Sequence, residues 1–284
     1  MSLVAPVTGP ETATEEPPGR KRRFELDLRE RSEFVLVPVS FVTLVLLWEY
    51  GVRWFDVPAF VLPPPSAIWE SLLSQLQTPR FWENLWVTTQ EIIAGYLIGV
   101  ISAFLIGVAV VQSRIIEKTV FPYVVAFQTV PKIALAPLFI IWFGFGMTSK
   151  ILIAALVSFF PMLINVIEGL RSADQDQIEL MRSLDATKRQ IFFKVQLPNS
   201  MPFVFAGLDI GIVFAIIGAV VGEWVGARAG LGYQLLQFIY DFNIAGLFAV
   251  LIVLAVMGLI AHWTIRFLQR RVAGWTEVDR TVAT

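Results

Sequence analysis

Six long apolar stretches, separated by polar segments, dominate the pattern of the chain. A helix needs about 20 apolar residues to cross the hydrocarbon core of a bilayer, and each stretch is close to that length. The pattern therefore predicts an all-α integral membrane protein with six transmembrane helices, at residues 34–52, 86–111, 119–143, 151–167, 201–225 and 244–263. The remaining segments are predicted as a partly disordered leader at 1–33, an external segment at 53–85, a five-span core at 86–269 and a tail at 270–284.

The third stretch is irregular because it contains Pro122, Pro131 and Pro137. Proline removes a backbone donor and clashes with the preceding turn. Three prolines predict kinks or a broken helix, which a membrane protein tolerates only where protein or a water-filled cavity covers the backbone.

Small residues repeat at every fourth position in two of the stretches, which allows another helix to approach closely. Two interpretations remain open for these ladders, an interface with a second chain or tight packing within one chain. The ladders consist of Gly95, Gly99, Ala103 and Gly107 in the second stretch, and of Gly218, Gly222 and Gly226 in the fifth. Residues 226–243, which follow, are predicted to form a Gly-rich polar loop.

Lysine and arginine are distributed unevenly between the two sides of the membrane. If the N-terminus is cytoplasmic, seventeen of the 22 lie on the cytoplasmic side, four on the outside, and Lys132 within a span. Cytoplasmic loops carry an excess of these residues. We therefore expect both termini, and the polar segment 168–200, to be cytoplasmic.

The segment 168–200 has the pattern of two short helices. Ser172 and Gln175 form a capping-box start, and residues 178, 181 and 184 then share one apolar helical face. A second helix is predicted over 186–196, closed by Pro198. The result is a cytoplasmic helix-turn-helix between the fourth and fifth spans, which is either a solvated amphipathic connector or a functional element.

Composition narrows the chemistry. The chain is 56% hydrophobic and 16% charged, with a net charge of −1, so nothing favours nucleic acid as a partner. It has no cysteine and a single histidine, His262, which argues against metal sites. There is no phosphate-binding loop and no catalytic triad, so we expect no enzymatic activity in this chain.

The spacing within 168–200 resembles the EAA motif of ABC-importer permeases. In that motif Glu-Ala-Ala is followed after three residues by Gly, and after nine more by Ile, any residue and Leu-Pro. Glu179, Leu197 and Pro198 match, Val195 replaces the isoleucine, and Asp185 replaces the glycine. Aspartate tolerates a positive φ better than most residues, and it is also a frequent helix N-cap.

Three further segments look like the nitrate, sulfonate, taurine and bicarbonate branch of these permeases, some members of which handle pyrimidine or flavin precursors. The segments are FVLPPPSAIWESL, VPKIALAPLFIIWFGFG and VVGEWVGARAGLGYQL. The resemblance covers roughly residues 55–270.

The resemblance implies a permease subunit of an ATP-driven importer in the bacterial plasma membrane, moving a small solute by alternating access. It further implies two copies of a separate ABC ATPase, a second permease chain, either in a homodimer or as the other half of a pair, and an external substrate-binding protein. ATP and Mg would be used by the ATPase, with no cofactor in this chain. The residues implied in coupling to the ATPase are Ile178, Glu179, Met181, Leu184, Asp185, Val195, Leu197 and Pro198.

Polar residues within the spans are candidates for the substrate path, because such residues are costly in a bilayer unless they face a partner or a cavity. Lys132 would meet an anionic solute or form an ion pair with Glu91 or Asp209. For Asp209 and Glu223, which lie near the ends of their spans, the alternative is that the side chain reaches water. For Gln128 and Asn165, the alternative is packing between helices. The full set is Gln128, Lys132, Asn165, Asp209 and Glu223. The rival function is a secondary transporter or channel that works alone.

Overall fold

The computed structural model describes residues 20–274 as a helical protein without strands. These residues fall into two units, which divide after Val57. The first unit contains α1 (Arg20–Trp54), of which Leu36–Trp54 is long and apolar enough to span a membrane. The helix thus begins earlier than the predicted span at residue 34, while residues 1–19 of the predicted leader lie outside the described part.

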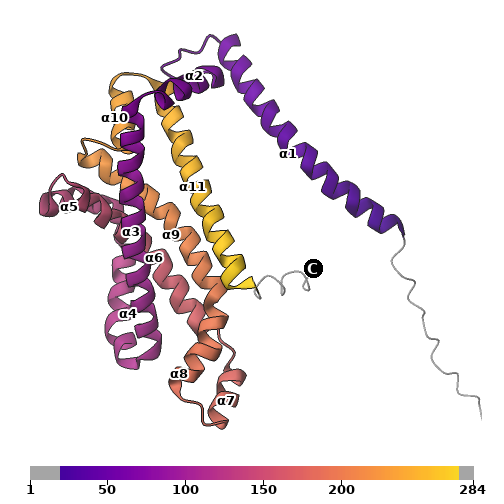
Figure 1. Ribbon diagram of the computed structural model, residues 1–284, viewed down its shortest axis with the longest axis vertical. Helices are drawn as coiled ribbons and strands as arrows, with labels where there is room; N and C mark the ends of the chain where they lie inside the picture. The colour runs from indigo at the N-terminus through magenta and orange to yellow at the C-terminus, as the bar shows by residue number, and fades with distance from the viewer. Residues whose placement is uncertain (1–19, 275–284) are drawn as a thin grey trace, which may run out of the picture. The chain divides into compact units, whose positions relative to one another are not determined.

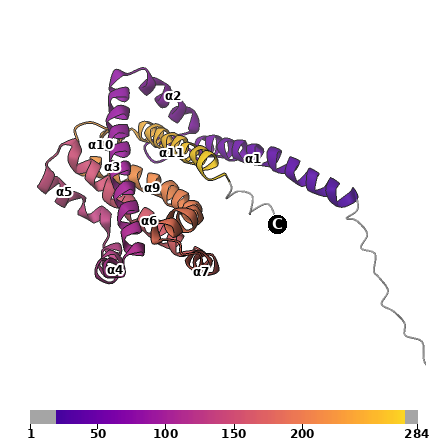
Figure 2. The same ribbon diagram turned by 60° about the horizontal axis from the view of Figure 1, so that its bottom comes forward.

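The second unit is a bundle in which α3 (Pro79–Gln112), α6 (Met147–Arg171) and α9 (Leu197–Gly226) pack against one another. In Figure 2, α4 (Arg114–Thr129) and α5 (Ala136–Phe143) lie on the α6 side, and α11 (Ile244–Val272) lies beside α9. Residues 20–274 contain five helices of spanning length, or six when the bent pair formed by α4 and residues 132–143 counts as one span. The predicted all-α architecture with six spans is confirmed.

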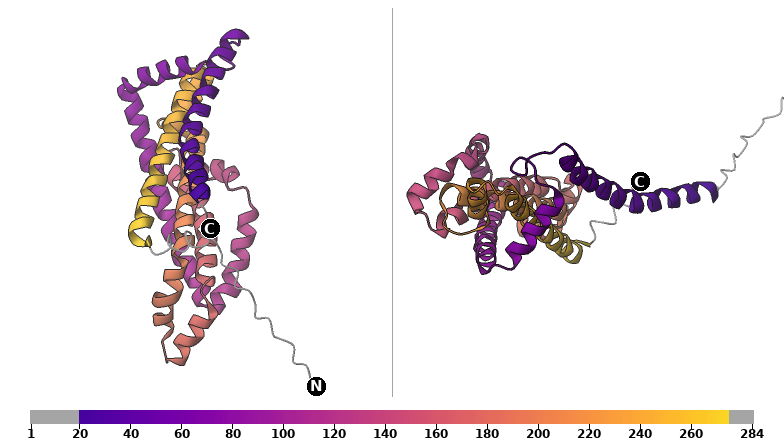
Figure 3. Two further views of the ribbon diagram at one scale, coloured as in Figure 1. Left: turned by 90° about the vertical axis from the view of Figure 1, so that its right-hand side faces the viewer. Right: turned by 90° about the horizontal axis from the view of Figure 1, so that it is seen from above.

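The two ends of this bundle differ in what they carry. The short helices α2 (Pro65–Leu76) and α10 (Leu231–Tyr240) lie at one end, and α7 (Gln175–Ser183) and α8 (Lys188–Ile191) lie at the other (Figures 1 and 3). Sequence patterns missed α2 and α10, and the predicted loop at 226–243 is therefore wrong. The sequence of α10 has the apolar stripe of a helix, but the glycines that flank it are typical of a loop and led to the wrong prediction.

The glycine ladders serve packing within this chain. A Cβ on Gly95 would lie 2.6 Å from Ala154 Cβ, and a Cβ on Gly218 would lie 2.8 Å from Ala154 Cα. α3 and α9 thus both approach α6 closely at Ala154. Close approach of this kind is what small residues permit in a membrane, where dispersion contacts hold helices together.

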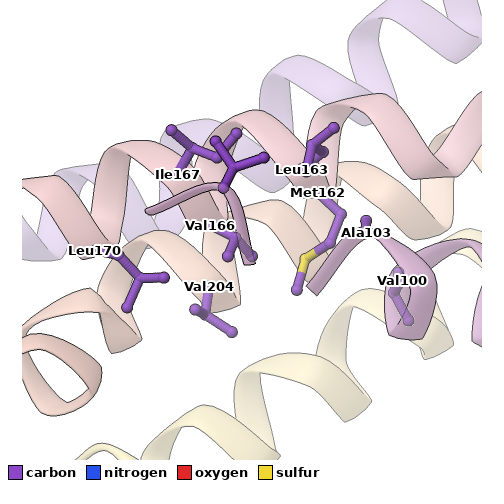
Figure 4. Packing of buried hydrophobic residues seen from close by; sticks show 9 residues of the cluster. Val100, Ala103, Met162, Leu163, Val166, Ile167, Leu170 and Val204 are labelled. Atoms are coloured by element: carbon purple, nitrogen blue, oxygen red, sulfur yellow. The ribbon is translucent and has the colours of Figure 1, made fainter. Parts of the chain in front are cut away.

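The apolar core continues below these contacts towards the end that carries α7. Figure 4 shows side chains of α3, α6 and α9 meeting there, with Met162, Leu163 and Val166 of α6 in the middle. Leu163 and Val166 are fully buried. Packing at this density resists changes of even one methylene group.

The third span is broken, as its prolines predict. α4 ends at Thr129, a 3₁₀ turn η1 (Lys132–Leu135) follows Pro131, and α5 then leaves at 88° to α4. Pro122 lies inside α4 without ending it, and Pro137 lies in the first turn of α5, where its missing N–H has no intrahelical partner to lose.

The packing predicts opposite effects for two helical glycines. We expect Gly99→Ala to lower the free energy of unfolding by about 1–3 kcal/mol, because the new Cβ would overlap the Ser158 side chain and lie 2.6 Å from Ala155 O. Gly258→Ala is the matched control in α11, since the nearest atom to its Cβ is Ile216 Cδ1 at 3.6 Å. It should gain up to about 1 kcal/mol from helix propensity. Thermal unfolding in detergent compares them, and equal effects would contradict this account of the ladder.

Candidate functional site

The first helix of the loop between α6 and α9 begins two residues later than its sequence suggests. The cap of α7 is Asp174, whose side chain accepts a hydrogen bond from Asp176 N at 3.0 Å. The predicted capping box from Ser172 is wrong. Ser172 instead ends α6, and its hydroxyl donates to Gly169 O.

The turn after α7 has the left-handed residue that the motif glycine would supply. Asp185 has φ 55°, and its backbone N–H donates to Arg182 O at 3.0 Å. The next helix is capped by Thr187, which forms a capping box with Gln190. Asp185 was considered as a residue of positive φ in the turn or as the N-cap of the second helix. In the structure it is the turn residue, and Thr187 is the N-cap.

The second helix of the loop does not stop at Pro198. α8 passes into a π-turn, η2 (Phe192–Gln196), which runs directly into α9. Pro198 occupies the first turn of α9, where the wider π-turn accommodates its missing donor. The predicted end of the helix is thus wrong, and the loop is joined to a span by continuous helical backbone.

A small apolar core holds α7 against α8 and η2. Ile178, Ile191 and Val195 are buried in it, and Met181 packs alongside. The opposite face of α7 is left open. Leu180 is 61% and Leu184 70% exposed there, beside exposed Glu179.

Leu184 therefore does not lie on the one apolar helical face predicted for it with residues 178 and 181. It lies in the last turn, where α7 unwinds towards Asp185. Leu197 and Pro198 are half-buried at the start of α9. Together with Val195, they connect the loop to the span.

Side chains at the same end connect the loop to the rest of the bundle. Arg171, the last residue of α6, pairs with Glu117 of α4 at 2.5 Å and lies over the Phe121 ring. Gln112 of α3 donates to Gln196 at 2.9 Å. A cavity of about 300 Å³ opens between α4 and α6 and is lined in part by Gln128 and Arg171.

Lys132 does not form the ion pair considered for it. Its Nζ donates to Gln128 O at 3.0 Å and lies 4.6 Å from the centre of the Phe160 ring. Between residues 20 and 274, no carboxylate pairs with it. The ammonium is thus held only by a carbonyl and an aromatic face, at the break of the third span.

The other polar residues predicted for the substrate path have partners within the chain. Asn165 donates to Pro161 O at 2.8 Å. Asp209 of α9 pairs with Nδ1 of His262 in α11 at 2.5 Å, so the single histidine has a polar partner.

Glu223 does not reach water, because its side chain is fully buried. Its Oε1 accepts from Thr88 Oγ1 at 2.6 Å, and its Oε2 accepts from the backbone N–H of Gly232 at 2.5 Å and of Tyr233 at 3.2 Å. These N–H groups belong to the first turn of α10. The carboxyl group thus binds a helix N-terminus, where the helix dipole favours negative charge.

The remaining donors at the start of α10 bind side chains of α3. Leu231 N donates to Thr88 Oγ1 at 2.7 Å, and Gly230 N donates to Asn84 Oδ1 at 2.9 Å. Gly230 has φ 116°, and a Cβ there would overlap the Glu223 carboxyl group. All four N–H groups at this helix start are therefore bound by side chains rather than by water.

Lys150 performs the matching task at the end of α9. It is 1% exposed, and its Nζ donates to Gly226 O at 2.6 Å, Phe145 O at 2.5 Å and Gly146 O at 3.0 Å. Gly226 is the last residue of α9, where the helix dipole favours a cation. Lys150 is one of the four basic residues that the charge distribution places on the outside, because it stands at the edge of an apolar stretch.

The buried set also includes Glu91 of α3, which the sequence singled out only as a partner for Lys132. Glu91 is 2% exposed, and its Oε2 is buried without a hydrogen-bond partner in the described part of the chain. Two acids and one lysine from three different spans are therefore buried in the described part of the chain. Each of the three is an ionisable residue in or beside an apolar stretch. Considering the three residues together, rather than one at a time, could have indicated this buried set.

The bundle resembles the transmembrane subunits of solved importers. An inward-facing structure of the MetNI methionine ABC transporter matches with a TM-score of 0.56 and 25% identity, covering 67% of this chain and 93% of that one. The architecture is thus that of an importer permease.

Sequence comparison identifies the family. The model of the binding-protein-dependent transport system inner membrane component matches residues 95–274. The formylaminopyrimidine transport permease protein ThiX of Halalkalibacterium halodurans is 34% identical, covering 87% of this chain and 98% of its own. The taurine transport system permease protein TauC of Escherichia coli is 30% identical, covering 82% and 86%.

The chain therefore belongs to the family of binding-protein-dependent transport system inner membrane components, in its nitrate, sulfonate and taurine branch. It is a permease subunit of an ABC importer for a small solute, and its family implies an inner-membrane location and partnership with an ATPase and a substrate-binding protein. This membership decides against a transporter or channel that works alone.

The turn at Asp185 yields a prediction about the motif position. Asp185→Gly should leave α7 as stable as before or more so, because glycine enters the left-handed region freely. Asp185→Val should destabilise the turn by about 1–2 kcal/mol. Hydrogen–deuterium exchange of the α7 amides measures this, with faster exchange expected in the valine variant only. Equal exchange in both variants would show that the turn does not depend on this φ.

Proposed function

We propose that this chain moves a small organic or oxyanion solute inward across the bacterial plasma membrane, driven by ATP hydrolysis in a separate subunit. The observation that carries the proposal is the exposed face of α7, formed by Glu179, Leu180 and Leu184, on a helix that its own apolar core holds in place. An amphipathic helix that offers an apolar face to a groove is a frequent docking mode.

The partner at this face is the ABC ATPase, with ATP and Mg²⁺ bound there and not in this chain. Two ATPase copies and two copies of this permease form the complex, and both termini and the loop are cytoplasmic. The buried residues of the loop core connect α7 to α9 through Val195 and η2, so that movement of α7 displaces a span.

The solute path follows the broken third span. Lys132 and Gln128 stand at the break, next to backbone that must be covered by a cavity or by protein. Asp209 and Glu223 are bonded to side chains of other helices, whereas Lys132 bonds only a carbonyl and lies against an aromatic ring at the break, so Lys132 and Gln128 are the better candidates for contact with a solute. The names of the relatives favour a sulfonate or a pyrimidine precursor, delivered by an external binding protein.

Substitution of the exposed α7 face tests the docking. Leu184→Asp should weaken association with the co-expressed ATPase at least about tenfold, because it places a charge in an apolar contact. Leu184→Met keeps the apolar surface and is the matched control, so it should associate normally. Co-purification and titration of the ATPase measure both variants. If Leu184→Asp binds as well as Leu184→Met, α7 is not the docking helix.

The absence of cysteine from the chain allows a direct test of orientation. Ser183→Cys and Tyr240→Cys place single thiols at exposed positions on α7 and α10, at opposite ends of the bundle. A membrane-impermeant thiol reagent that reaches the outer face of the plasma membrane should label only the thiol at position 240. Labelling at position 183 alone would reverse the orientation.

A further inference from the structure

We propose that the C-terminal end of α11 binds the headgroup of one anionic phospholipid, in the leaflet on the side of the bundle that carries α7. The acyl chains of this lipid lie along an exposed apolar stripe of the same helix. The site goes beyond the proposed transport function, because it takes a component of the membrane rather than the transported solute. It does not depend on the direction of transport, and neither the motif nor the family membership assigns it.

The first argument is a hollow of about 500 Å³ at this end of the helix. Among the described residues, its lining consists of His262, Trp263, Arg266, Phe267 and Arg270. Arg266 and Arg270 are exposed and one helical turn apart, so both guanidinium groups can bind the same phosphate. Between residues 20 and 274, no carboxylate forms a salt bridge with Arg266.

The second argument is the charge around the hollow. Arg271 adds a third guanidinium group, which lies 5.3 Å from the centre of the Phe267 ring. Asp209 brings a carboxylate to the hollow, and this carboxylate is paired with His262. Three arginines therefore outnumber that acid, and basic pockets of this kind at the cytoplasmic ends of spans bind anionic lipid headgroups.

The third argument is an apolar stripe that leads along α11 to the hollow. Ile252, Val256, Leu259 and Trp263 are between 42% and 64% exposed. Their spacing of three or four residues continues through both arginines of the hollow, so all of these side chains share one helical face. At 1.5 Å per residue, the stripe from residue 252 to residue 263 is about 16 Å long, which is close to half of a ~30 Å hydrocarbon core. The stripe therefore has the length of one leaflet.

The order of groups along this face identifies a phospholipid as the ligand. α11 begins beside α10 and runs towards the end that carries α7 (Figure 1), passing from the apolar stripe to Trp263 and then to the arginines. Tryptophan is the usual anchor at the membrane interface. Hydrocarbon, interfacial aromatic ring and cation thus follow one another as acyl chain, glycerol and phosphate do in a lipid. A free phosphate would use the arginines alone, and a zwitterionic headgroup would bring its own cation to them.

Retention of lipid by the full chain tests the headgroup site. The protein is released from nanodiscs of equal phosphatidylglycerol and phosphatidylcholine, and bound lipid is counted by native mass spectrometry. The double variant Arg266→Gln with Arg270→Gln should bind phosphatidylglycerol about 30-fold more weakly than the wild type, because each arginine at a membrane surface contributes about fivefold. Phosphatidylcholine binding should not change.

The matched control removes the same charge from the loop at the same end of the bundle. Arg182→Gln with Arg189→Gln replaces two exposed arginines of α7 and α8, and it should retain phosphatidylglycerol as the wild type does. Equal losses in the two double variants would show that net charge alone attracts the lipid, and would overturn the site. Displacement of the lipid by millimolar inorganic phosphate would overturn the part assigned to the apolar stripe.

Photo-crosslinking in the same nanodiscs tests the stripe. The chain has no cysteine, so Leu259→Cys and Ile98→Cys each carry one benzophenone maleimide, at positions that are 48% and 49% exposed. Position 259 should capture phosphatidylglycerol in excess over phosphatidylcholine, and the excess should vanish when Arg266 and Arg270 are replaced. Position 98 should capture the two lipids in the proportion of the bilayer. The same ratio at both positions, or crosslinking of position 259 to protein instead of lipid, would contradict the proposal.

Association with the ATPase separates this site from the docking face of α7. The Arg266→Gln, Arg270→Gln variant should bind the co-expressed ATPase as the wild type does, because its substitutions lie on α11. A variant that loses the ATPase but retains phosphatidylglycerol would assign these arginines to the protein partner and overturn the lipid site. Failure of the docking proposal would leave the lipid measurements unchanged, since they use the permease chain without the ATPase.

Discussion

The bundle depends on how the backbone groups at the break between α9 and α10 are hydrogen-bonded away from water. α9 ends and α10 begins within a few residues, and a helix end leaves several carbonyl or N–H groups without partners. Two buried side chains of opposite sign supply the hydrogen bonds that water would otherwise form. Lys150 donates to the carbonyl at the end of α9, and Glu223 accepts from the N–H groups at the start of α10. Each also matches the dipole of its helix end. Because the two residues come from α6 and α9, the break fixes those spans and places α10.

The consequences extend to the neighbouring helices through amide side chains. Asn84 of α3 donates to Gln234 of α10, Gln234 donates to Gln75 of α2, and Gln75 donates to the backbone of α11. This end of the molecule is thus held by directional polar bonds. The opposite end has a small apolar core, the Arg171–Glu117 ion pair and the Gln112–Gln196 hydrogen bond, and it leaves one face of α7 exposed. The rigid end and the open end are joined by three tightly packed spans.

Sequence patterns predicted those parts of the fold that depend on local chemistry. Apolar length identified the spans, prolines identified the break of the third span, and motif spacing located α7 and the unusual turn at Asp185. The errors arise where distant residues decide. Lys150 seemed to lie in water because its partners are carbonyls that no pattern reveals. α10 was missed because its flanking glycines, required by contact with Glu223, are typical of a loop. The sequence likewise left open which helix packs on the glycine ladders, because tertiary contacts decide it.

The unbroken course of α9 has a mechanical consequence. From Leu197 to Gly226 it extends about 45 Å, at 1.5 Å per residue, and η2 prolongs it into the loop. Its small residues interlock with α6, so neither helix can slide along the other without leaving one set of contacts for the next. A force applied at the loop therefore displaces the two spans as one rigid lever. The movement of these two helices relative to their neighbours occurs in discrete steps, because packed interfaces are bistable rather than continuously deformable.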